Sequence, residues 1–571
     1  MMKKFHRILP NMLTVLSAGF ILTGLLLSGD ALIALLRDPA AIPAALLSDL
    51  QTGALLFRAN LIVLGGAGLL LSRLRVWNAP TPPDTSSPVF SRGEWLALGL
   101  ILLAALGLRL YRLNTGLWLD EMTTYINYVQ KPFGIIATTY DSQNQHFLFS
   151  FLARLSTLVF GDGAWSLRLP AVLFGVGSIA AFYLLARQLT DRRESLLGAG
   201  LMALTYHHIW FSQNARGYTG LLFWTLLSSW LLVRGLRRPT PGLWLGYAVT
   251  ASLGVFTQMT MLFVIAGHFI IYLLDLLRRR AVRPRGWVGL AYGFVPAGLL
   301  TLQLHALVFP QILADFTKRT EGASYGEWQN PLWTVLEIIQ SIRIGAAGWV
   351  VIAAGLIVFG IGVASWRRDR SVVPQLFFIP TVIVAAVTIA TGHNIWPRLF
   401  FFAMGFGLLI ALRGVMVLPV LLARLRQVDP QQLAWLGTAM GIAILLAASA
   451  LIPFVYGPKQ DYHTAMVFVE IHRQPGDAVT TTGLAAFAYT RYYQTDWQEV
   501  ESVDALEAIR QDAPRTWFLY TFPPHMRALY PDILNRVEQE FTLVEEFPGT
   551  LNGGTVFVYL SDKSGVQTAV K

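Results

Sequence analysis

Long apolar stretches alternate with short polar connections over most of this chain, and the alternation stops near Tyr456. A helix needs about 20 predominantly apolar residues to cross the roughly 30 Å hydrocarbon core of a bilayer. The stretches therefore predict about thirteen membrane-spanning helices. They lie at residues 9–28, 54–73, 95–112, 168–187, 196–211, 218–234, 243–256, 261–277, 287–306, 346–365, 374–391, 398–415 and 433–453.

The pattern changes beyond Tyr456. A helical stretch at 462–473 is followed by a turn at Pro475-Gly476-Asp477. Helical segments at 503–511 and 524–540 then alternate with short strand-like runs near 478–482, 515–521, 541–546 and 555–560. Such alternation is typical of a layered α/β unit. The predicted fold class is thus an α-helical polytopic membrane protein with a small C-terminal α/β soluble domain.

Composition along the chain divides it into four parts. Residues 1–77 hold two N-terminal membrane helices, and the Pro/Ser-rich segment 78–94 is a linker. Residues 95–455 form the main membrane domain, with long loops at 113–167 and 307–345, and the α/β domain follows at 456–571. We expect the first apolar stretch to be a retained signal anchor, because it is long and lacks a clear small-residue cleavage site.

The distribution of charge predicts the orientation. Lys and Arg gather in short clusters at alternate connections, for example at Arg278-Arg279-Arg280, which is the positive-inside pattern. This pattern places the N-terminus and the linker in the cytoplasm, and both long loops and the α/β domain outside a cell (inner) membrane. The net charge of +11 is therefore no sign of a nucleic-acid partner. The chain has no cysteine, which excludes disulfides and thiolate chemistry.

The first candidate chemistry lies in loop 113–167. The segment Trp118-Leu119-Asp120-Glu121 places two acids just beyond a predicted span. Asp120 could simply cap a surface helix while Glu121 stays solvated. Three further features of the loop argue against that interpretation. They are Asn144-Gln145-His146, the turn Phe160-Gly161-Asp162 and the helix entry Leu167-Arg168-Leu169-Pro170.

Two later segments have the same character: Gln213-Asn214-Ala215-Arg216-Gly217-Tyr218, and His393-Asn394-Ile395-Trp396-Pro397-Arg398. In order and spacing, all these segments resemble the GT-C glycosyltransferases, in particular the bacterial relatives of the protein O-mannosyltransferases and the aminoarabinose lipid A transferases. The resemblance covers about residues 95–415. It departs at Phe147-Leu148, where many relatives have Pro-Pro after the histidine, and at Asn214, where many have an acid. Both departures affect what the resemblance implies about the substrate, and they leave the resemblance to the family itself intact.

The resemblance implies a GT-C-type membrane fold and a reaction at the outer membrane face. A sugar would move from a polyprenyl-phosphate donor to a hydroxyl acceptor, with inversion at the anomeric carbon. Asp120 matches the family's general base, and Glu121 would orient Asp120 or hold the acceptor. A positioned carboxylate that accepts the hydroxyl proton contributes roughly 10²- to 10⁴-fold in rate. The acceptor stays open: a protein, a lipid or a growing glycan.

Two arginines are candidates to stabilise the departing lipid phosphate. Arg216 and Arg398 stand at the outer ends of predicted spans, where a guanidinium can bind phosphate oxygens through two parallel hydrogen bonds. The alternative for each is snorkelling to lipid headgroups. Asn144, His146 and Tyr218 complete the predicted substrate-binding set. His146 could instead ligate a metal or satisfy a buried carbonyl. The chain shows no clear metal-ligand spacing, so neither a metal nor another cofactor is predicted.

Two other functions compete with glycosyl transfer. A transporter or flippase for a lipid-linked saccharide would also use a polytopic body and rim cations. Transporters, however, place charges near the bilayer midplane and often contain inverted repeats. Here mid-span charges are few, Arg58 being the clearest, and no repeat is evident. A non-catalytic assembly protein would leave the Asp120–Glu121 pair without a task. The main hypothesis is therefore a membrane glycosyltransferase.

Overall fold

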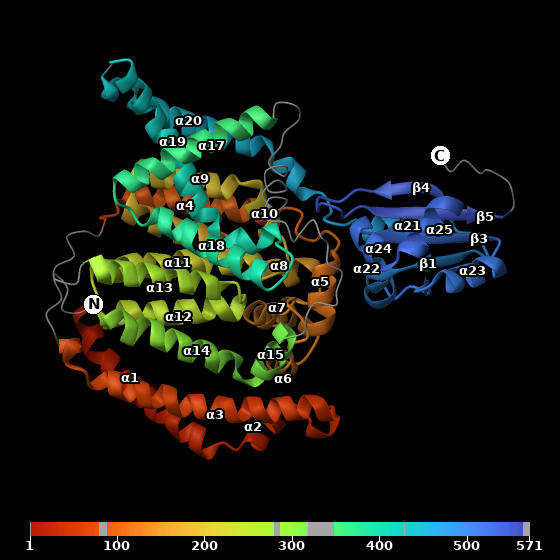
Figure 1. Ribbon diagram of the computed structural model, residues 1–571, viewed down its shortest axis with the longest axis horizontal. Helices are drawn as coiled ribbons and strands as arrows, with labels where there is room; N and C mark the ends of the chain where they lie inside the picture. The colour runs from red at the N-terminus through yellow and green to blue at the C-terminus, as the bar shows by residue number, and fades with distance from the viewer. Residues whose placement is uncertain (1, 79–87, 279–285, 318–347, 428, 564–571) are drawn as a thin grey trace.

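The computed structural model describes residues 2–78, 88–278, 286–317, 348–427 and 429–563. Most of them form a bundle of helices that run side by side, and an α/β unit projects from one end of this bundle (Figure 1). In the described part, 11 helices are long and apolar enough to cross a membrane. They are α1 (Met2–Leu26), α3 (Ala44–Arg73), α4 (Arg92–Leu110), α8 (Ala164–Leu189), α11 (Tyr218–Arg237), α13 (Met261–Arg278), α14 (Val295–His305) continued by α15 (Phe309–Thr317), α17 (Gly348–Arg368), α18 (Val373–Ala390), α19 (Met404–Leu425) and α20 (Pro430–Ala450). The predicted class, a polytopic helical membrane protein, is confirmed.

Two of the predicted spans account for the lower count. The segment predicted at 196–211 consists of α9 (Arg192–Leu204) and α10 (Tyr206–Ser212), which meet at the extended residue Thr205. The segment predicted at 243–256 is α12 (Pro241–Thr257), whose 17 residues span only about 25 Å at 1.5 Å per residue. Both segments still lie inside the bundle, since α12 packs between α11 and α14 and α9 packs against α4 and α8.

The predicted loop 307–345 begins later in the structure. Helix α15 continues the preceding span to Thr317, so residues 309–317 are helical rather than part of a loop. The remainder, 318–345, lies outside the described residues, as do residues 79–87 of the predicted linker.

The two N-terminal spans are attached to the main domain. Helix α1 packs along α3, and Asn60 of α3 donates to the carbonyl of Leu299 and to Oε1 of Gln303 in α14, both at 2.9 Å. Between these spans, α2 (Gly29–Leu36) packs on α6 (Phe133–Thr138) of the first long loop. Arg37 follows α2 and donates to the hydroxyls of Thr138 and Thr139 at 2.7 and 2.5 Å. The N-terminal helices thus support the loop as well as the bundle.

The C-terminal unit contains a five-stranded mixed sheet of order β2-β1-β3-β5-β4. Its strands are β1 (Ala478–Thr481), β2 (Gln498–Glu499), β3 (Arg515–Thr521), β4 (Thr542–Phe547) and β5 (Val556–Asp562). Strand β1 pairs in parallel with β2 and β3, and β5 pairs antiparallel with β3 and β4. All residues of β3 are buried, because both faces of the sheet are covered. The predicted small α/β domain is confirmed.

Helices of the C-terminal unit follow the sequence pattern with one difference. They are α21 (Tyr462–His472), α22 (Gly483–Ala486), α23 (Val503–Asp512), α24 (Pro523–Leu529) and α25 (Pro531–Glu540). The predicted segment 524–540 is two helices, because Pro531 starts a new helix and cannot continue the hydrogen-bond ladder of the old one. Strand β2 was not predicted, since two residues show no periodicity.

Glycines set the crossing of α17 and α19. A methyl group at Gly362 would collide with the carbonyl oxygen of Ile410, and one at Gly414 would collide with that of Val358. The two backbones are therefore in direct contact, as small residues allow in membrane bundles.

This contact predicts opposite effects for two glycines of α17. Gly362→Ala should destabilise the protein by about 1–3 kcal/mol, because the new methyl overpacks the crossing. Gly360→Ala is the matched control, since a Cβ there meets nothing within 4 Å, and it should be neutral or stabilise by up to about 1 kcal/mol. Thermal unfolding in detergent measures both variants. Equal unfolding midpoints would show that the crossing is not close-packed.

Candidate active site

The candidate acids lie on a short helix just beyond the end of α4. This helix, α5 (Leu119–Thr124), starts with two backbone amides that have side-chain acceptors. The amide of Trp118 donates to Oε2 of Glu121 at 3.3 Å, and the amide of Leu119 donates to Oε1 of Gln460 at 3.2 Å. These bonds satisfy donors that a helix start leaves open. Carboxylates in the first turn also suit the positive end of the helix dipole, which explains why Asp120 and Glu121 stand here.

Glu121 points into the protein and has no exposed surface. Its carboxylate accepts from Nε and Nη2 of Arg168 at 2.8 and 2.6 Å and from the amide of Ala215 at 2.7 Å. Burial alone would raise the pKa of Glu121, but the charges of Arg168 and Lys459 and these hydrogen bonds lower it. The carboxylate is therefore ionised and saturated with donors. This arrangement favours orienting Asp120 over holding an acceptor.

Arg168 completes this buried pair from α8. It donates to three carbonyls of the connection between α4 and α5, those of Leu113, Thr115 and Gly116, at 2.8 to 2.9 Å. All of its contacts are hidden, because the side chain is only 1% exposed. Arg168 and Glu121 together fix the start of the long loop against α8.

Asp120 faces two other arginines. Its Oδ2 lies 3.2 Å from Nη1 of Arg398 and 3.9 Å from Nη2 of Arg216. The Arg216 side chain is 4% exposed, whereas Asp120 and Arg398 are 22% and 37% exposed. The carboxylate thus stands between a fixed inner guanidinium and an accessible outer one, and the outer one also lies over the ring of Trp396 at 5.3 Å.

Asn144 connects Arg216 to α5. The Nη1 of Arg216 donates to the side-chain oxygen of Asn144, to its carbonyl at 3.2 Å and to the hydroxyl of Thr124 at 3.3 Å. The Asn144 amide donates to the carbonyl of Asp120 at 3.4 Å. Tyr218 lies beneath the guanidinium, with its ring centroid 5.8 Å from the Arg216 Cζ. These contacts explain why an asparagine in the loop and an arginine before α11 belong to one site.

His146 is buried beside Tyr218, with the ring centroids 5.6 Å apart in an edge-to-face arrangement. Its Nδ1 accepts from the amide of Gly217 at 2.7 Å. A Cβ at Gly217 would lie 3.0 Å from that nitrogen, so the close approach needs a glycine. Burial, with the charges of Arg216 and Arg398, holds the pKa of His146 well below its ordinary value. The ring is therefore neutral, its proton is on Nε2, and Nε2–H is a donor.

The structure thus gathers Asp120, Asn144, His146, Arg216, Tyr218 and Arg398 into one group. Hydrogen bonds from Gln460 and Lys459 place this group beside the α/β unit. Glu121 stands behind this group rather than in it. Within the described ranges, no three His, Asp or Glu side chains are placed to hold a metal ion.

Comparison with known proteins bears on what this group of residues does. Residues 144–300 match the family described as dolichyl-phosphate-mannose-protein mannosyltransferase. The chain resembles the GT-C membrane glycosyltransferases. The resemblance predicted from the loop motifs is thereby confirmed. The matched stretch contains Asn144, His146 and Arg216, whereas Asp120 and Arg398 lie outside it.

The individual proteins to which the chain is similar are distant. The protein named "Putative mannosyltransferase YkcB" of Bacillus subtilis (strain 168) is 26% identical over 197 residues. The match covers 31% of this chain and 26%, about a quarter, of that protein. Apo ArnT from Cupriavidus metallidurans is 13% identical, and the match covers 82% of this chain and 97% of the ArnT chain with a TM-score of 0.44. The oligosaccharyltransferase AglB from Archaeoglobus fulgidus, in complex with an inhibitory peptide and a dolichol-phosphate, is 11% identical, with 82% and 74% covered and a TM-score of 0.42.

The α/β unit reaches back to the helix that carries Asp120. Lys459 donates to the carbonyl of Gln213 at 2.6 Å and lies 5.1 Å from the ring centroid of Trp210. The next residue, Gln460, accepts from the start of α5 and donates to Thr521 of β3 at 3.4 Å. The segment that links bundle and sheet therefore also holds the candidate active site.

A shared hydrophobic core strengthens this connection. The loop residues Leu117, Met122 and Phe149 belong to the same buried cluster as Tyr462 and Trp517 of the α/β unit. The sheet shares one of its two cores with the loop, while residues such as Phe518 and Leu534 form a second core within the α/β unit. The α/β unit is thus a support for α5.

Sequence reasoning missed three residues of this arrangement. Arg168 was noticed only as part of a motif, without a partner. Lys459 and Gln460 were not singled out, because a lysine soon after the last span reads as an ordinary rim charge. Nothing in the local pattern shows that Lys459 is buried beside Trp210.

The buried pair predicts a large effect at Glu121. Removal of one partner leaves an uncompensated buried charge, so Glu121→Gln should destabilise the protein by about 3–5 kcal/mol. Folding lowers the pKa of Glu121. The loss of stability in the variant relative to wild type should therefore be complete at pH values above the ordinary pKa of glutamate. It should vanish as the pH falls through the lowered pKa of the folded protein. Thermal unfolding in detergent measures it. Asp162→Asn, at an exposed acid of the same loop, is the control and should be neutral. Equal stability of both variants would contradict a structural role for the pair.

Lys459 predicts a dependence on alkaline pH. Burial and the charge of Arg168 lower the pKa of Lys459 to about 7 against the opposing effect of Glu121. Between that value and the ordinary lysine pKa, the unfolded chain binds more protons than the folded one. Stability should therefore rise with pH in this window, by at most about 1.4 kcal/mol per pH unit. Unfolding midpoints over this range should rise less in Lys459→Met than in wild type, while the exposed-site control Lys131→Met keeps the wild-type profile. Identical profiles for all three proteins would contradict the burial of a titrating amine.

Proposed function

We propose that this chain is an inverting glycosyltransferase that moves a sugar from a polyprenyl-phosphate donor to a hydroxyl acceptor at the outer face of the membrane. The family relationship supports glycosyl transfer as the activity. The observation that supports the rest best is the placement of Asp120 against Arg398 and Arg216, which sets a base beside cations at the rim of the bundle. The orientation, with the N-terminus in the cytoplasm and the α/β unit outside, rests on the positive-inside pattern.

Asp120 is the proposed general base. Its carboxylate takes the proton of the acceptor hydroxyl as that oxygen attacks the anomeric carbon. The bond between that carbon and the phosphate oxygen breaks, and its electron pair leaves with the lipid phosphate. A single displacement of this kind inverts the anomeric centre. Asp120 suits the task because its side chain is 22% exposed, whereas Glu121 is enclosed by donors.

The two arginines have different proposed tasks. Arg398 is the more exposed cation and can turn to the departing phosphate, where a preorganised positive charge is worth far more than in water. Arg216 is held by Asn144 and Thr124, and it stays behind to fix the electrostatic surroundings of Asp120. In the absence of donor, Asp120 compensates the charge of Arg398. A bound phosphate would take over that role and leave the carboxylate to accept a proton.

His146 and Tyr218 complete the proposed substrate site. Because the Nδ1 of His146 accepts a backbone hydrogen bond, only its Nε2–H can contact the donor. A neutral donor of this kind can bind a phosphate oxygen or a sugar hydroxyl without a change of charge. Asn144 acts through Arg216 and the backbone of Asp120, which makes it a positioning residue.

Substitution of the base tests the proposal. Asp120→Asn should lower transfer by roughly 10²- to 10⁴-fold, because the amide cannot accept the hydroxyl proton. The measurement is transfer from a panel of radiolabelled polyprenyl-phosphate sugars by purified protein in detergent, with thermal unfolding to show that the variant is folded. Asp162→Asn, in the same loop, should transfer at the wild-type rate.

Other outcomes would reject the proposal in different ways. Full transfer by a folded Asp120→Asn protein would remove the base assignment. No transfer by the wild type from any sugar, together with movement of the donor between leaflets of a vesicle, would favour a flippase. An assembly protein would show neither activity.

A further inference from the structure

A polar cavity lies at the opposite end of the bundle from the candidate active site. It has a volume of about 450 Å³ and is bounded by the far ends of α8, α11 and α13 and by the turn between α17 and α18. Helix α11 shows the separation, since Tyr218 at its start belongs to the candidate site and Arg237 at its end lines this cavity. Nothing in the proposed glycosyl transfer uses this region.

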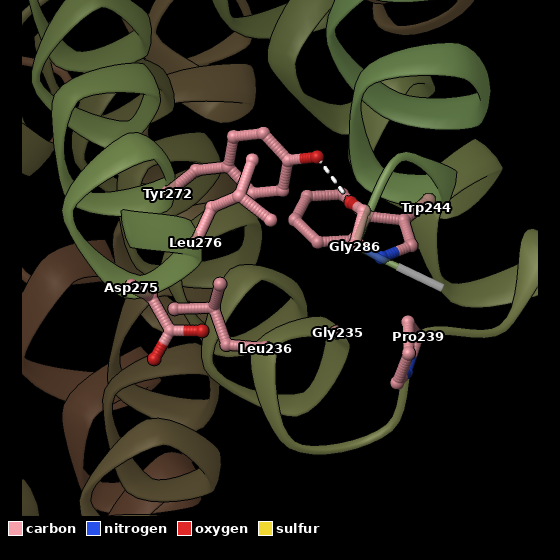
Figure 2. Close-up of a pocket in the computed structure, with 8 residues that line it drawn as sticks. All are labelled: Gly235, Leu236, Pro239, Trp244, Tyr272, Asp275, Leu276 and Gly286. Carbon is pink, nitrogen blue, oxygen red and sulfur yellow. Dashed lines mark hydrogen bonds between the residues drawn. The ribbon is translucent and has the colours of Figure 1, made fainter. Parts of the chain in front are cut away.

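A narrower neighbour of this cavity lies between α11, α12 and α13 (Figure 2). Leu236 and Asp275 line both spaces. In the neighbour, the hydroxyl of Tyr272 donates to the carbonyl of Gly286, and the remaining space of about 20 Å³ suits a single water. Only the larger cavity has room for a ligand.

Three arginines line the larger cavity: Arg237, Arg278 and Arg370. They come from three different elements, α11, α13 and the turn after α17. Arg237 is oriented by Gln188, whose side-chain and backbone oxygens accept from it at 3.2 and 3.0 Å. Clusters of basic residues are expected on a cytoplasmic face. Convergence of three guanidinium groups on one cavity goes beyond that expectation.

The acids of the cavity do not cancel this charge. Asp369 and Asp275 also line it. Asp369, however, accepts from Nη2 of Arg413 at 2.5 Å, and Arg413 does not line the cavity. Arg413 also pairs with Glu194 at 3.1 Å, so its charge is shared between two acids. Even with both Asp369 and Asp275 counted, three arginines line the cavity against two acids, an excess that favours an anion.

Ser371 and Gln375 are the other polar residues of the wall. Most of the remaining wall is apolar and includes Leu189, Ile271 and Val372. A free phosphate would find no partners among these side chains, whereas the glycerol and upper acyl carbons of a lipid would bury apolar surface there. The basic and the apolar side chains of this wall match the two parts of one molecule.

We propose that this cavity binds the phosphate headgroup of an anionic phospholipid from the leaflet opposite to the candidate active site. The guanidinium groups would hold the phosphate oxygens through charge-assisted hydrogen bonds. The proposal does not depend on the glycosyltransferase activity, because no residue of the cavity belongs to the candidate active site.

Native mass spectrometry of the full-length chain tests this site. The protein is delipidated in a non-ionic detergent and titrated with dioleoyl phosphatidylglycerol. The double variant Arg278→Gln/Arg370→Gln should weaken binding of the first lipid by roughly tenfold or more, because it removes two charge-assisted contacts. Arg193→Gln, at an exposed arginine of the same face that does not line the cavity, should bind as wild type. Asp120→Asn should also bind as wild type.

Three results would overturn the proposal: equal binding by the double variant, binding of dioleoyl phosphatidylcholine as tight as that of phosphatidylglycerol, and displacement of the lipid by millimolar inorganic phosphate. The last result would assign the cavity to a soluble phosphate instead. If the double variant is not folded by thermal unfolding, the single variants Arg278→Gln and Arg370→Gln replace it, and wild-type affinity in both would overturn the proposal in the same way.

Discussion

The buried ion pair between Glu121 and Arg168 is the interaction on which the site depends. Two charges withdrawn from water are expensive unless every lone pair and proton finds a partner. Here the carboxylate accepts from Arg168 and from the amide of Ala215, and the guanidinium also donates to carbonyls of the loop. One pair thereby joins α5, α8 and the segment before α11. Because the pair fixes α5 in place, it also fixes the direction in which Asp120 points.

Adjacent positions on one helix turn have opposite environments in this protein. Asp120 and Glu121 differ little in intrinsic acidity, yet Glu121 is enclosed by hydrogen-bond donors and Asp120 lies at the edge between Arg216 and Arg398. Since helix geometry turns successive side chains by about 100°, neighbours necessarily face different surroundings. In the proposed function, one acid of this pair therefore serves the structure and the other serves the chemistry.

Much of this arrangement could be predicted from the sequence because it depends on local pattern. Apolar length identified the eleven long spans, and period and turn residues identified β1, β3, β4 and β5. The pattern overestimates the number of spans where it cannot detect a break in a helix, as at Thr205 between α9 and α10. The residues around Asp120 were found through motif order, which does not require knowledge of distance.

What could not be predicted is contact between distant segments. Arg398 lies 278 positions from Asp120, and only the fold shows that they meet. The burial of Lys459 depends on Trp210 and Gln213, and the cap by Gln460 depends on how the α/β unit docks. Each of these contacts joins residues that are far apart in the sequence, and many other residues could have formed it. No single residue type or spacing identifies the contacting residues in advance.

The core shared by the loop and the α/β unit also has a consequence for biosynthesis. Residues 456–563 leave the ribosome after the eleven described spans, yet Gln460 caps α5 and Trp517 belongs to the same buried cluster as Met122. A nascent chain that has inserted these spans therefore still lacks the support for the helix that carries Asp120. The order of translation thus delays completion of the site until the α/β unit has been made and has folded onto α5.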